Sequence, residues 1–421
     1  MTKTAHIIGA GLSGLSAGVR LAGQGFEVHV HEATQYTGGR CRSYYDGATD
    51  MVIDNGNHLM LSGNHHVRLY AKTLNTYDKL VGPARAQFPF MDVASGKRWL
   101  LDLGAGRFPG WLFDAKRRVP DTTVRDYLAL LPLVWAKPDA LVEDTIPCEG
   151  VLYQRLVAPL LIAALNVEPP QGSAGLAGAI VRETLLAGGA ACRPLIARDG
   201  LSPVLIDPAI ELIRKKGGSL TLGHELRKIE RSPLRATGLD FGDETIPLGP
   251  GDVVVLAVPA RAASGLLPGI DAPTKFRAIL NAHFRYVPPA DVPALTGVVG
   301  GLIEWLFAFP DRLSITISAA ERLINLPRED LARDIWRDIC KVAGLSTDVA
   351  KGPLPPWQIV RERRATFEAT PEQNALRPGA ATELKNLFLA GDWTNTGLPS
   401  TIEGSIRSGD HAADLILQMQ E

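Results

Sequence analysis

Three glycines near the start of the chain stand at the spacing that brings a peptide backbone against a phosphate. Residues 5–14 read AHIIGAGLSG, which places Gly9, Gly11 and Gly14 in the pattern GxGxxG between an apolar stretch and a helix-forming stretch. In such a turn the first glycine bends the chain, the second lets the backbone approach a pyrophosphate, and the third lets the helix pack against the strand. The N-terminus of the helix adds unpaired N–H groups for the phosphates. The pattern therefore predicts a dinucleotide-binding turn.

An acid and an arginine follow where such a nucleotide could use them. Glu32 ends a second strand candidate that starts at Glu27, and an acid about 20 residues into this unit can accept hydrogen bonds from ribose hydroxyls. This predicts a dinucleotide with a free 2′-hydroxyl. Gly38, Gly39 and Arg40 come next, and a guanidinium offers a fork of donors to a pyrophosphate oxygen. The competing interpretation is a turn with a solvated arginine.

Three titratable side chains could carry proton chemistry, and each has a structural alternative. Asp54 and His58 lie in the sequence Asp-Asn-Gly-Asn-His, and Glu403 lies in Ser-Thr-Ile-Glu. A neutral His58 could simply hydrogen-bond backbone or cofactor, and Asp54 could orient an arginine. Ser400 and Glu403 have the spacing of a capping box, in which the two side chains satisfy each other's backbone N–H groups.

The elements that must position these residues alternate between strand and helix in three separate stretches. A Val-rich strand at 252–258, another at 387–390 and an edge strand at 224–230 that contains Leu226 extend the first α/β unit. We expect an α/β fold with a Rossmann-like domain interrupted by two insertions, which form a mixed sheet-and-helix (α+β) domain. The predicted boundaries are 1–68, 200–260 and 367–421 for the first domain, and 69–199 and 261–366 for the second.

Within the insertions, apolar periodicity predicts helices at 123–136, 152–167 and 327–342, and antiparallel strands at 298–309 and 314–317. Residues 107–118 place bulky apolar side chains beside three consecutive basic ones, which is typical of a segment that sits in a lipid headgroup layer. We expect peripheral membrane contact within residues 107–136. An ordinary surface turn whose aromatic side chains pack on the core is the alternative.

Composition restricts the class of protein. The chain has 421 residues, a formal net charge of −1 and 46% hydrophobic residues, so no global field would attract nucleic acid. The four cysteines form no CxxC, which argues against a metal site or a disulfide framework and fits a reducing cytoplasm. The start of the chain lacks a signal-peptide pattern. The longest apolar runs, 157–165 and 128–136, fall short of the roughly 20 residues of a membrane-spanning helix.

Taken together, these motifs resemble the flavoprotein amine oxidase and phytoene desaturase superfamily. The match uses GxGxxG with Glu32, the Gly-Gly-Arg at 38–40, the strand end at 257–259 and the late Gly391-Asp392, and it covers the whole chain. The runs 54–58, 281–285, 318–320 and 397–409 are similar to the squalene-associated FAD-dependent desaturases of bacterial hopanoid biosynthesis, which are understood as hydroxysqualene dehydroxylases. Where that pattern has glutamine, this chain has Asn57.

The resemblance implies noncovalent FAD held by residues from all three stretches. The pyrophosphate would be contacted by Gly9, Gly11, Ser13 and Gly14, the adenosine ribose by Glu32 and Ala33, and adenine by Leu226. The phosphates would also be contacted by Gly39 and Arg40, and the ribityl chain or phosphate by Gly391 and Asp392. The flavin would have Asn57 near it, with Thr401 and Ile402 under the isoalloxazine.

The resemblance also implies a reaction in which hydride from reduced FAD replaces the allylic hydroxyl of hydroxysqualene, giving squalene and water. His58, Asp54 and Glu403 are the candidates for proton delivery, an external donor must reduce FAD, and the protein is expected on the inner face of the cytoplasmic membrane. The alternatives are a carotenoid desaturase or amine oxidase on the same scaffold, and a non-enzymatic lipid carrier of the GDP-dissociation-inhibitor type. No nucleic acid or metal is expected.

Overall fold

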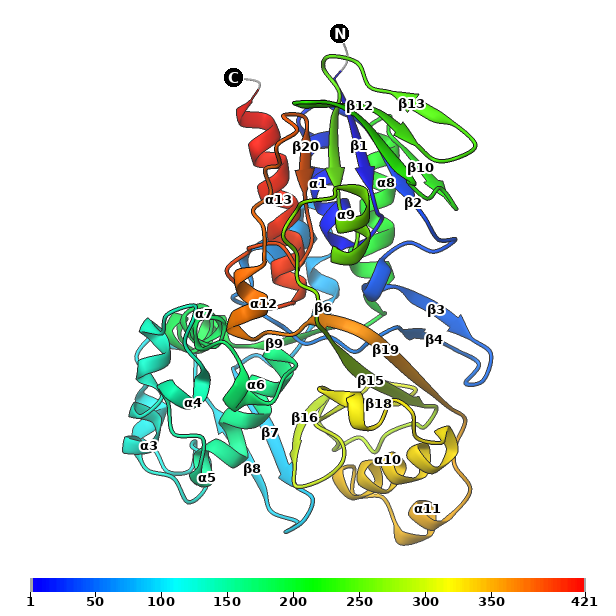
Figure 1. The fold of residues 1–421 in the computed structure, drawn as a ribbon. Coiled ribbons are helices and arrows are strands. Elements are labelled where there is room, and N and C mark those ends of the chain that lie inside the picture. Colours follow the sequence, from blue (N-terminus) through cyan, green and yellow to red (C-terminus); the bar gives the residue numbers. More distant parts are fainter. Residues whose placement is uncertain (1–2, 420–421) are drawn as a thin grey trace.

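A computed structural model describes residues 3–419 (Figure 1). A five-stranded parallel sheet in the upper half of Figure 1 has the order β10-β2-β1-β14-β20. Its strands come from three distant stretches of the chain: β1 (Thr4–Ile8), β2 (Glu27–Glu32), β10 (Ser219–Leu222), β14 (Val253–Leu256) and β20 (Leu387–Leu389). All four residues of β14 are buried, as its run of valines predicts for a strand covered on both faces.

Helices cover one face of this sheet and a small second sheet covers the other. Helix α1 (Leu12–Gly23) packs between α8 (Asp207–Lys215) and α13 (Ile402–Gln418), and Gly409 permits the close approach because a Cβ there would lie 2.0 Å from Ser16 Oγ. On the other face, Ile8, Ile229, Leu239 and Val254 share one apolar cluster. This cluster joins the parallel sheet to the antiparallel strands β11 (Lys228–Ser232), β12 (Arg235–Asp240) and β13 (Thr245–Pro247), with α9 (Ala260–Leu266) beside them.

A seven-stranded sheet forms the lower half of the molecule, with the order β19-β15-β18-β17-β16-β7-β8 (Figure 1). Its strands are β7 (Gln87–Asp92), β8 (Arg98–Asp102), β15 (Phe276–Phe284), β16 (Leu295–Val299), β17 (Trp305–Ala308), β18 (Leu313–Ile317) and β19 (Trp357–Phe367). All neighbours are antiparallel except β16 and β7, which confirms the predicted antiparallel arrangement. The stretch predicted over 298–309 is divided, because β16 ends at Val299 and β17 begins at Trp305. Helix α10 (Arg328–Val342) covers one face through Leu331, Ile335 and Trp336, as its periodicity predicts.

The other face of this sheet packs against helices from the first insertion, at the lower left of Figure 1. They are α3 (Val124–Leu128), α4 (Val142–Thr145), α5 (Gly150–Leu152), α6 (Ala158–Leu165) and α7 (Ala174–Glu183). The single helix predicted over 123–136 is wrong. It ends after Leu128, and residues Leu131–Trp135 form a 3₁₀ segment with Pro132 near its start, because proline cannot donate the hydrogen bond that would continue the α-helix.

Short elements connect the two halves. They are the hairpin β3 (Ser43–Asp46) and β4 (Met51–Asp54), the strands β5 (Met60–Leu61), β6 (Leu80–Val81) and β9 (Pro194–Ala197), and the helices α2 (His65–Thr73) and α12 (Pro371–Ala375). Helix α11 (Thr347–Lys351) instead packs beside α10 in the lower half (Figure 1). The predicted edge strand from residue 224 is also wrong at its start. The backbone N–H of His224 donates to the carbonyl of Glu32, so the segment containing Leu226 crosses from one sheet to the other. Strand pairing begins only at Lys228.

Candidate active site

The glycine-rich turn leaves one face of Gly11 open. A Cβ on Gly9, where φ is +108°, would lie 2.5 Å from the carbonyl oxygen of Ala257, and a Cβ on Gly14 would lie 2.1 Å from the carbonyl oxygen of Gly9. Gly9 and Gly14 are therefore required by packing. A Cβ on Gly11, at the N-terminus of α1, would meet nothing within 4 Å. The open space beside helix N–H groups fits the pyrophosphate of a dinucleotide.

Glu32 braces this turn from the end of β2. One carboxylate oxygen accepts a hydrogen bond from the N–H of Ala10 at 2.9 Å, and the other accepts from the N–H and hydroxyl of Thr34, each at 2.9 Å. The N–H of Gly223, shortly before Leu226, donates to the carbonyl of Thr34. Glu32, its neighbour Ala33 and Leu226 therefore lie around one corner of the sheet, where the sequence predicts the adenosine.

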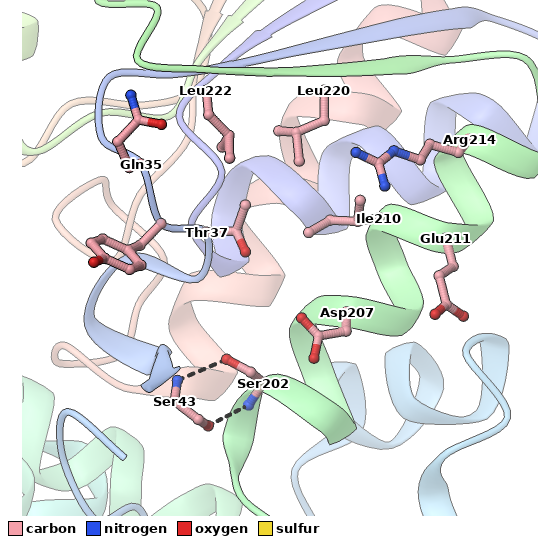
Figure 2. A pocket seen from close by; sticks show the side chains of 11 residues that line it. Gln35, Thr37, Ser43, Ser202, Asp207, Ile210, Glu211, Arg214, Leu220 and Leu222 are labelled. Atoms are coloured by element: carbon pink, nitrogen blue, oxygen red, sulfur yellow. Dashed lines mark hydrogen bonds between the residues drawn. The ribbon is translucent and has the colours of Figure 1, made fainter. Parts of the chain in front are cut away.

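A pocket of about 360 Å³ opens on the α8 side of the loop that follows β2 (Figure 2). Asp207 and Glu211 of α8 border it, and Ser43 and Ser202 close one side through two reciprocal backbone-to-hydroxyl hydrogen bonds of 2.7 and 2.9 Å. Arg214 lies on the same wall, so the pocket carries both charges and is less suited to a phosphate than the open space beside Gly11.

An ion pair joins the second glycine turn to the C-terminal stretch. Gly38 and Gly39 have positive φ angles, and the N–H of Gly38 donates to the carbonyl of Ala10 at 2.8 Å. Arg40 Nη2 lies 2.6 Å from Asp392 Oδ1, and its Nη1 donates to the carbonyl of Ala365. Burial works to raise the pKa of Asp392, but the charge and hydrogen bond of Arg40 outweigh it and hold that pKa below its ordinary value.

Asp54, one of the predicted acids, forms hydrogen bonds that connect neighbouring segments of the chain. Asp54 is 5% exposed, and its Oδ1 accepts hydrogen bonds from Ser43 Oγ at 2.5 Å and from the N–H of Leu201 at 2.9 Å. Burial raises the pKa of Asp54, although these hydrogen bonds oppose the rise. The carboxyl group thus ties β3, β4 and the chain at residue 201 together.

Glu403 caps a neighbouring helix, and the predicted capping box is wrong. Its two oxygens each accept a hydrogen bond of 3.0 Å, from the N–H groups of His66 and Val67 in the first turn of α2. Helix α13 begins at Ile402, and its N-cap is Thr401, whose hydroxyl accepts from the N–H of Gly404 at 3.0 Å. Because the helix starts after Thr401, Glu403 lies too early in its first turn to bond back to Ser400.

His58 is a neutral imidazole beside the ion pair. Its Nε2 lies 3.9 Å from Cys41 Sγ, and burial, with a smaller contribution from the charge of Arg40, lowers its pKa to about 4. Near neutral pH the ring can therefore donate or accept a hydrogen bond, but it holds no extra proton to release. The preceding residue, Asn57, donates to the carbonyl of Ile315 at 3.0 Å.

The structure thus connects Gly11, Gly38, Arg40 and Asp392 through one set of contacts at the ends of α1 and β20. Gly391, Thr401 and Ile402 flank Asp392 and the start of α13. Two residues that position this region have no assigned role in the sequence analysis: Asn281 and His283, which bond to the 54–58 segment. Their polar type on alternate positions of a buried strand is the signal that could have identified them.

The family model for flavin containing amine oxidoreductases matches residues 12–417. The chain belongs to this family. Among curated relatives, the hydroxysqualene dehydroxylase of Sinorhizobium fredii is 62% identical, and that of Rhodopseudomonas palustris is 63% identical, each over 99% of both chains. The solved cyclohexylamine oxidase of Brevibacterium oxydans covers 100% of both chains with a TM-score of 0.71 at 17% identity, which shows the shared fold.

As a member of this family, the chain is an FAD-dependent oxidoreductase with a mixed α/β fold. This confirms the predicted cofactor and enzyme class over the lipid-carrier interpretation. Among residues 3–419, no helix is long and apolar enough to cross a membrane. Within the same residues, no group of three or more His, Cys, Asp or Glu side chains is arranged to hold a metal ion.

Proposed function

We propose that this flavin enzyme converts hydroxysqualene to squalene: a hydride from reduced FAD replaces the allylic hydroxyl, which takes up one proton and leaves as water. The observation that carries the proposal is the identity of 62–63% to two hydroxysqualene dehydroxylases over 99% of each chain. When bound, FAD supplies reversible two-electron hydride chemistry, so the protein must position the substrate, exclude water and assist the departing hydroxyl. An external donor must reduce the cofactor between turnovers.

FAD is proposed to bind along the contacts that join the three stretches of the parallel sheet. Gly9, Gly11, Ser13 and Gly14 would receive the pyrophosphate, which is supported by the open face of Gly11. The other predicted contacts follow the cofactor along its length. The adenosine would contact Glu32, Ala33 and Leu226. The phosphates and ribityl chain would contact Gly39, Arg40, Gly391 and Asp392, and the flavin would contact Asn57, Thr401 and Ile402. These residues would form one FAD domain from 1–68, 200–260 and 367–421, with 69–199 and 261–366 forming the substrate domain.

His58 is proposed to contact the departing hydroxyl. Both carboxyl groups that compete for this role accept hydrogen bonds from backbone N–H groups of neighbouring segments, namely Asp54 from Leu201 and Glu403 from α2. His58, by contrast, forms no such backbone bond with any residue that the structure describes, and its ring lies near Cys41. As a neutral imidazole it can donate an N–H hydrogen bond to the oxygen that leaves as water.

The substrate is a long hydrocarbon, and an exposed apolar surface supports delivery from a membrane. Phe108, Phe113 and Trp135 are 76%, 69% and 75% exposed, and the rings of Phe108 and Phe113 stack with centroids 6.3 Å apart. Lys116 and Arg118 lie in the same segment and could meet anionic headgroups. Trp111 packs edge-on against Tyr127, so the anchor is proposed to consist of Phe108, Phe113 and Trp135.

The test is an anaerobic reaction of the reduced holoprotein with hydroxysqualene. Flavin reoxidation should follow mixing, with one squalene formed per flavin reoxidised. The same reduced protein mixed with squalene should show no reoxidation, and the oxidised protein mixed with a primary amine should show no flavin reduction. Flavin that remains reduced, with no squalene formed, would contradict the proposed reaction.

A further inference from the structure

Four polar side chains form a compact array in the middle of the seven-stranded sheet. Asn281 pairs directly with Thr316 across β15 and β18, and His283 pairs directly with Ser314. Residues two apart in a strand point to the same face, so the four side chains lie together. Asn281 is 2% exposed, and His283 and Ser314 are 0% exposed. Burying this many polar groups costs stability unless their hydrogen bonds are satisfied.

Each cross-strand pair is internally bonded in a way that fixes its orientation. The hydroxyl of Thr316 lies 2.7 Å from Asn281 Oδ1, and Ser314 Oγ lies 2.8 Å from His283 Nδ1. His283 Nε2 lies 3.0 Å from the carbonyl oxygen of Asp54. Because a carbonyl can only accept, Nε2 must carry the hydrogen and Nδ1 must accept from Ser314. Burial, followed by the charge of Arg312, lowers the pKa of His283 to about 3, so this neutral form persists near neutral pH.

Both pairs bond to the segment 54–58, which we call the histidine turn. His283 donates to the carbonyl of Asp54 at its start, and Asn281 Oδ1 accepts from the backbone N–H of Asn57 at 3.2 Å. A third contact comes from β18, where the carbonyl of Ile315 accepts from Asn57 Nδ2 at 3.0 Å. The turn is thus attached to the sheet at both ends by its backbone and by one side chain.

This attachment leaves one acceptor without a partner. Because the carbonyl of Ile315 requires the nitrogen of the Asn57 amide to face it, Asn57 Oδ1 must point the other way. Among the residues that the structure describes, this buried oxygen has no hydrogen-bond donor. A buried acceptor of this kind is costly without a partner, so it is available to a bound ligand. The Asn281 amide and the His58 ring both lie next to Gly56, because a Cβ on Gly56 would lie 3.2 Å from Asn281 Nδ2 and 3.7 Å from His58 Nε2.

We propose that Asn281, His283, Ser314 and Thr316 are positioning residues, which hold the histidine turn so that Asn57 Oδ1 and the His58 ring face the bound cofactor and substrate. This inference rests on the proposed function, in which His58 contacts the departing hydroxyl. The array acts through the turn and does not itself touch the reacting atoms. Small displacements of a positioned group reduce catalysis steeply, by up to roughly 100-fold for about 1 Å.

The test compares His283→Phe with His283→Gln. Phenylalanine fills similar space but leaves the carbonyl of Asp54 without its donor, whereas glutamine can still present an N–H near the position of Nε2. In holoprotein with full FAD occupancy, we expect His283→Phe to slow flavin reoxidation by hydroxysqualene by about 10- to 100-fold, with little change in KM. His283→Gln should recover most of the rate. Thr316→Val is a milder second variant, which removes only the hydroxyl that orients Asn281.

The matched control is Thr296→Val on β16. Thr296 is also buried in this sheet at 2% exposure, but it points to the face that α10 covers, as does Val298 two residues further along β16, so it lies away from the histidine turn and the control should keep the wild-type rate. The visible circular dichroism of bound FAD is recorded for every variant and should change for His283→Phe and Thr316→Val only. Wild-type rates in both of these variants, or a loss that only tracks lost FAD, would overturn the proposal. If the wild type itself does not react with hydroxysqualene, the proposed function fails. The dichroism of bound FAD then tests the positioning role, and a spectrum of His283→Phe that matches the wild type overturns it.

Discussion

Replacing Gly11 by valine should abolish tight FAD binding while leaving the apoprotein folded. The space beyond Gly11 is open to 4 Å, and its φ of −79° is one that any residue adopts. The folded apoprotein therefore has room for the new side chain, and loss of a favourable N-cap residue costs about 1 kcal/mol or less. The same space is where the pyrophosphate is proposed to lie, so valine and cofactor compete for it.

The magnitude follows from ligand linkage. At an FAD concentration of about 1,000 times the wild-type Kd, binding stabilises the fold by about 4 kcal/mol. If valine weakens binding about 100-fold, the same concentration is only about ten times the new Kd, and the stabilisation falls to about 1.4 kcal/mol. Thermal or urea unfolding with and without FAD measures this difference, and fluorescence titration of the apoprotein with FAD gives Kd directly.

Two glycines serve as matched controls. Gly14→Ala should destabilise the apoprotein itself, because the new Cβ would lie 2.1 Å from the carbonyl oxygen of Gly9. Gly23→Ala, at the other end of α1, meets nothing within 4 Å and should leave both stability and FAD affinity near wild type. A Gly11→Val protein that binds FAD as tightly as the wild type would refute the placement of the pyrophosphate.

Three further predictions follow from particular contacts. Glu403→Gln should lower the free energy of unfolding by about 1 kcal/mol, because an amide has one acceptor oxygen for the two N–H groups of α2. Urea denaturation measures this change, and unchanged stability with lost activity would instead favour a catalytic role. Replacing Phe108 and Phe113 by serine should release the protein from anionic liposomes in a sedimentation assay, and unchanged sedimentation would exclude them as the anchor. Burial, with nearby histidines, lowers the pKa of His6 to about 4 and of His31 to about 3, from the ordinary histidine value of 6.5. The unfolded chain then binds more protons, so stability should fall as pH drops below 6.5, by about 2 kcal/mol for each histidine and about 4 kcal/mol for the two between about pH 7 and about pH 5; a flat urea midpoint over this range would contradict the assignment of neutral rings.

The residues that could be predicted from sequence are those whose signal is local. Gly9, Gly11 and Gly14 depend on the conformation and packing of one turn, so a short pattern defines them. The amphipathic face of α10 is likewise a local periodicity, and the structure places it on the sheet as predicted. Family resemblance assigned Arg40 and the distant Gly391-Asp392 turn to the same cofactor, but it did not predict the ion pair between Arg40 and Asp392.

Two of the errors arise where the chain bonds to a segment far away in the sequence. Glu403 has the spacing of a capping box, but its partners are N–H groups more than 300 residues earlier in the sequence. Leu226 lies in an alternating stretch, yet the bond from His224 to Glu32 takes that stretch out of the strand. Asn281 and His283 are a third example. Both polar residues are visible in the sequence, but only the fold shows that they bond to the histidine turn.

The central claim is that the new C–H bond of squalene comes from the reduced cofactor of this enzyme. The most direct measurement is a single turnover in D₂O, in which holoprotein equilibrated and reduced in that solvent is mixed anaerobically with hydroxysqualene, and the product is analysed by mass spectrometry. The account predicts squalene that carries one deuterium, formed in step with flavin reoxidation. Squalene without deuterium, or reoxidation without squalene, would contradict it.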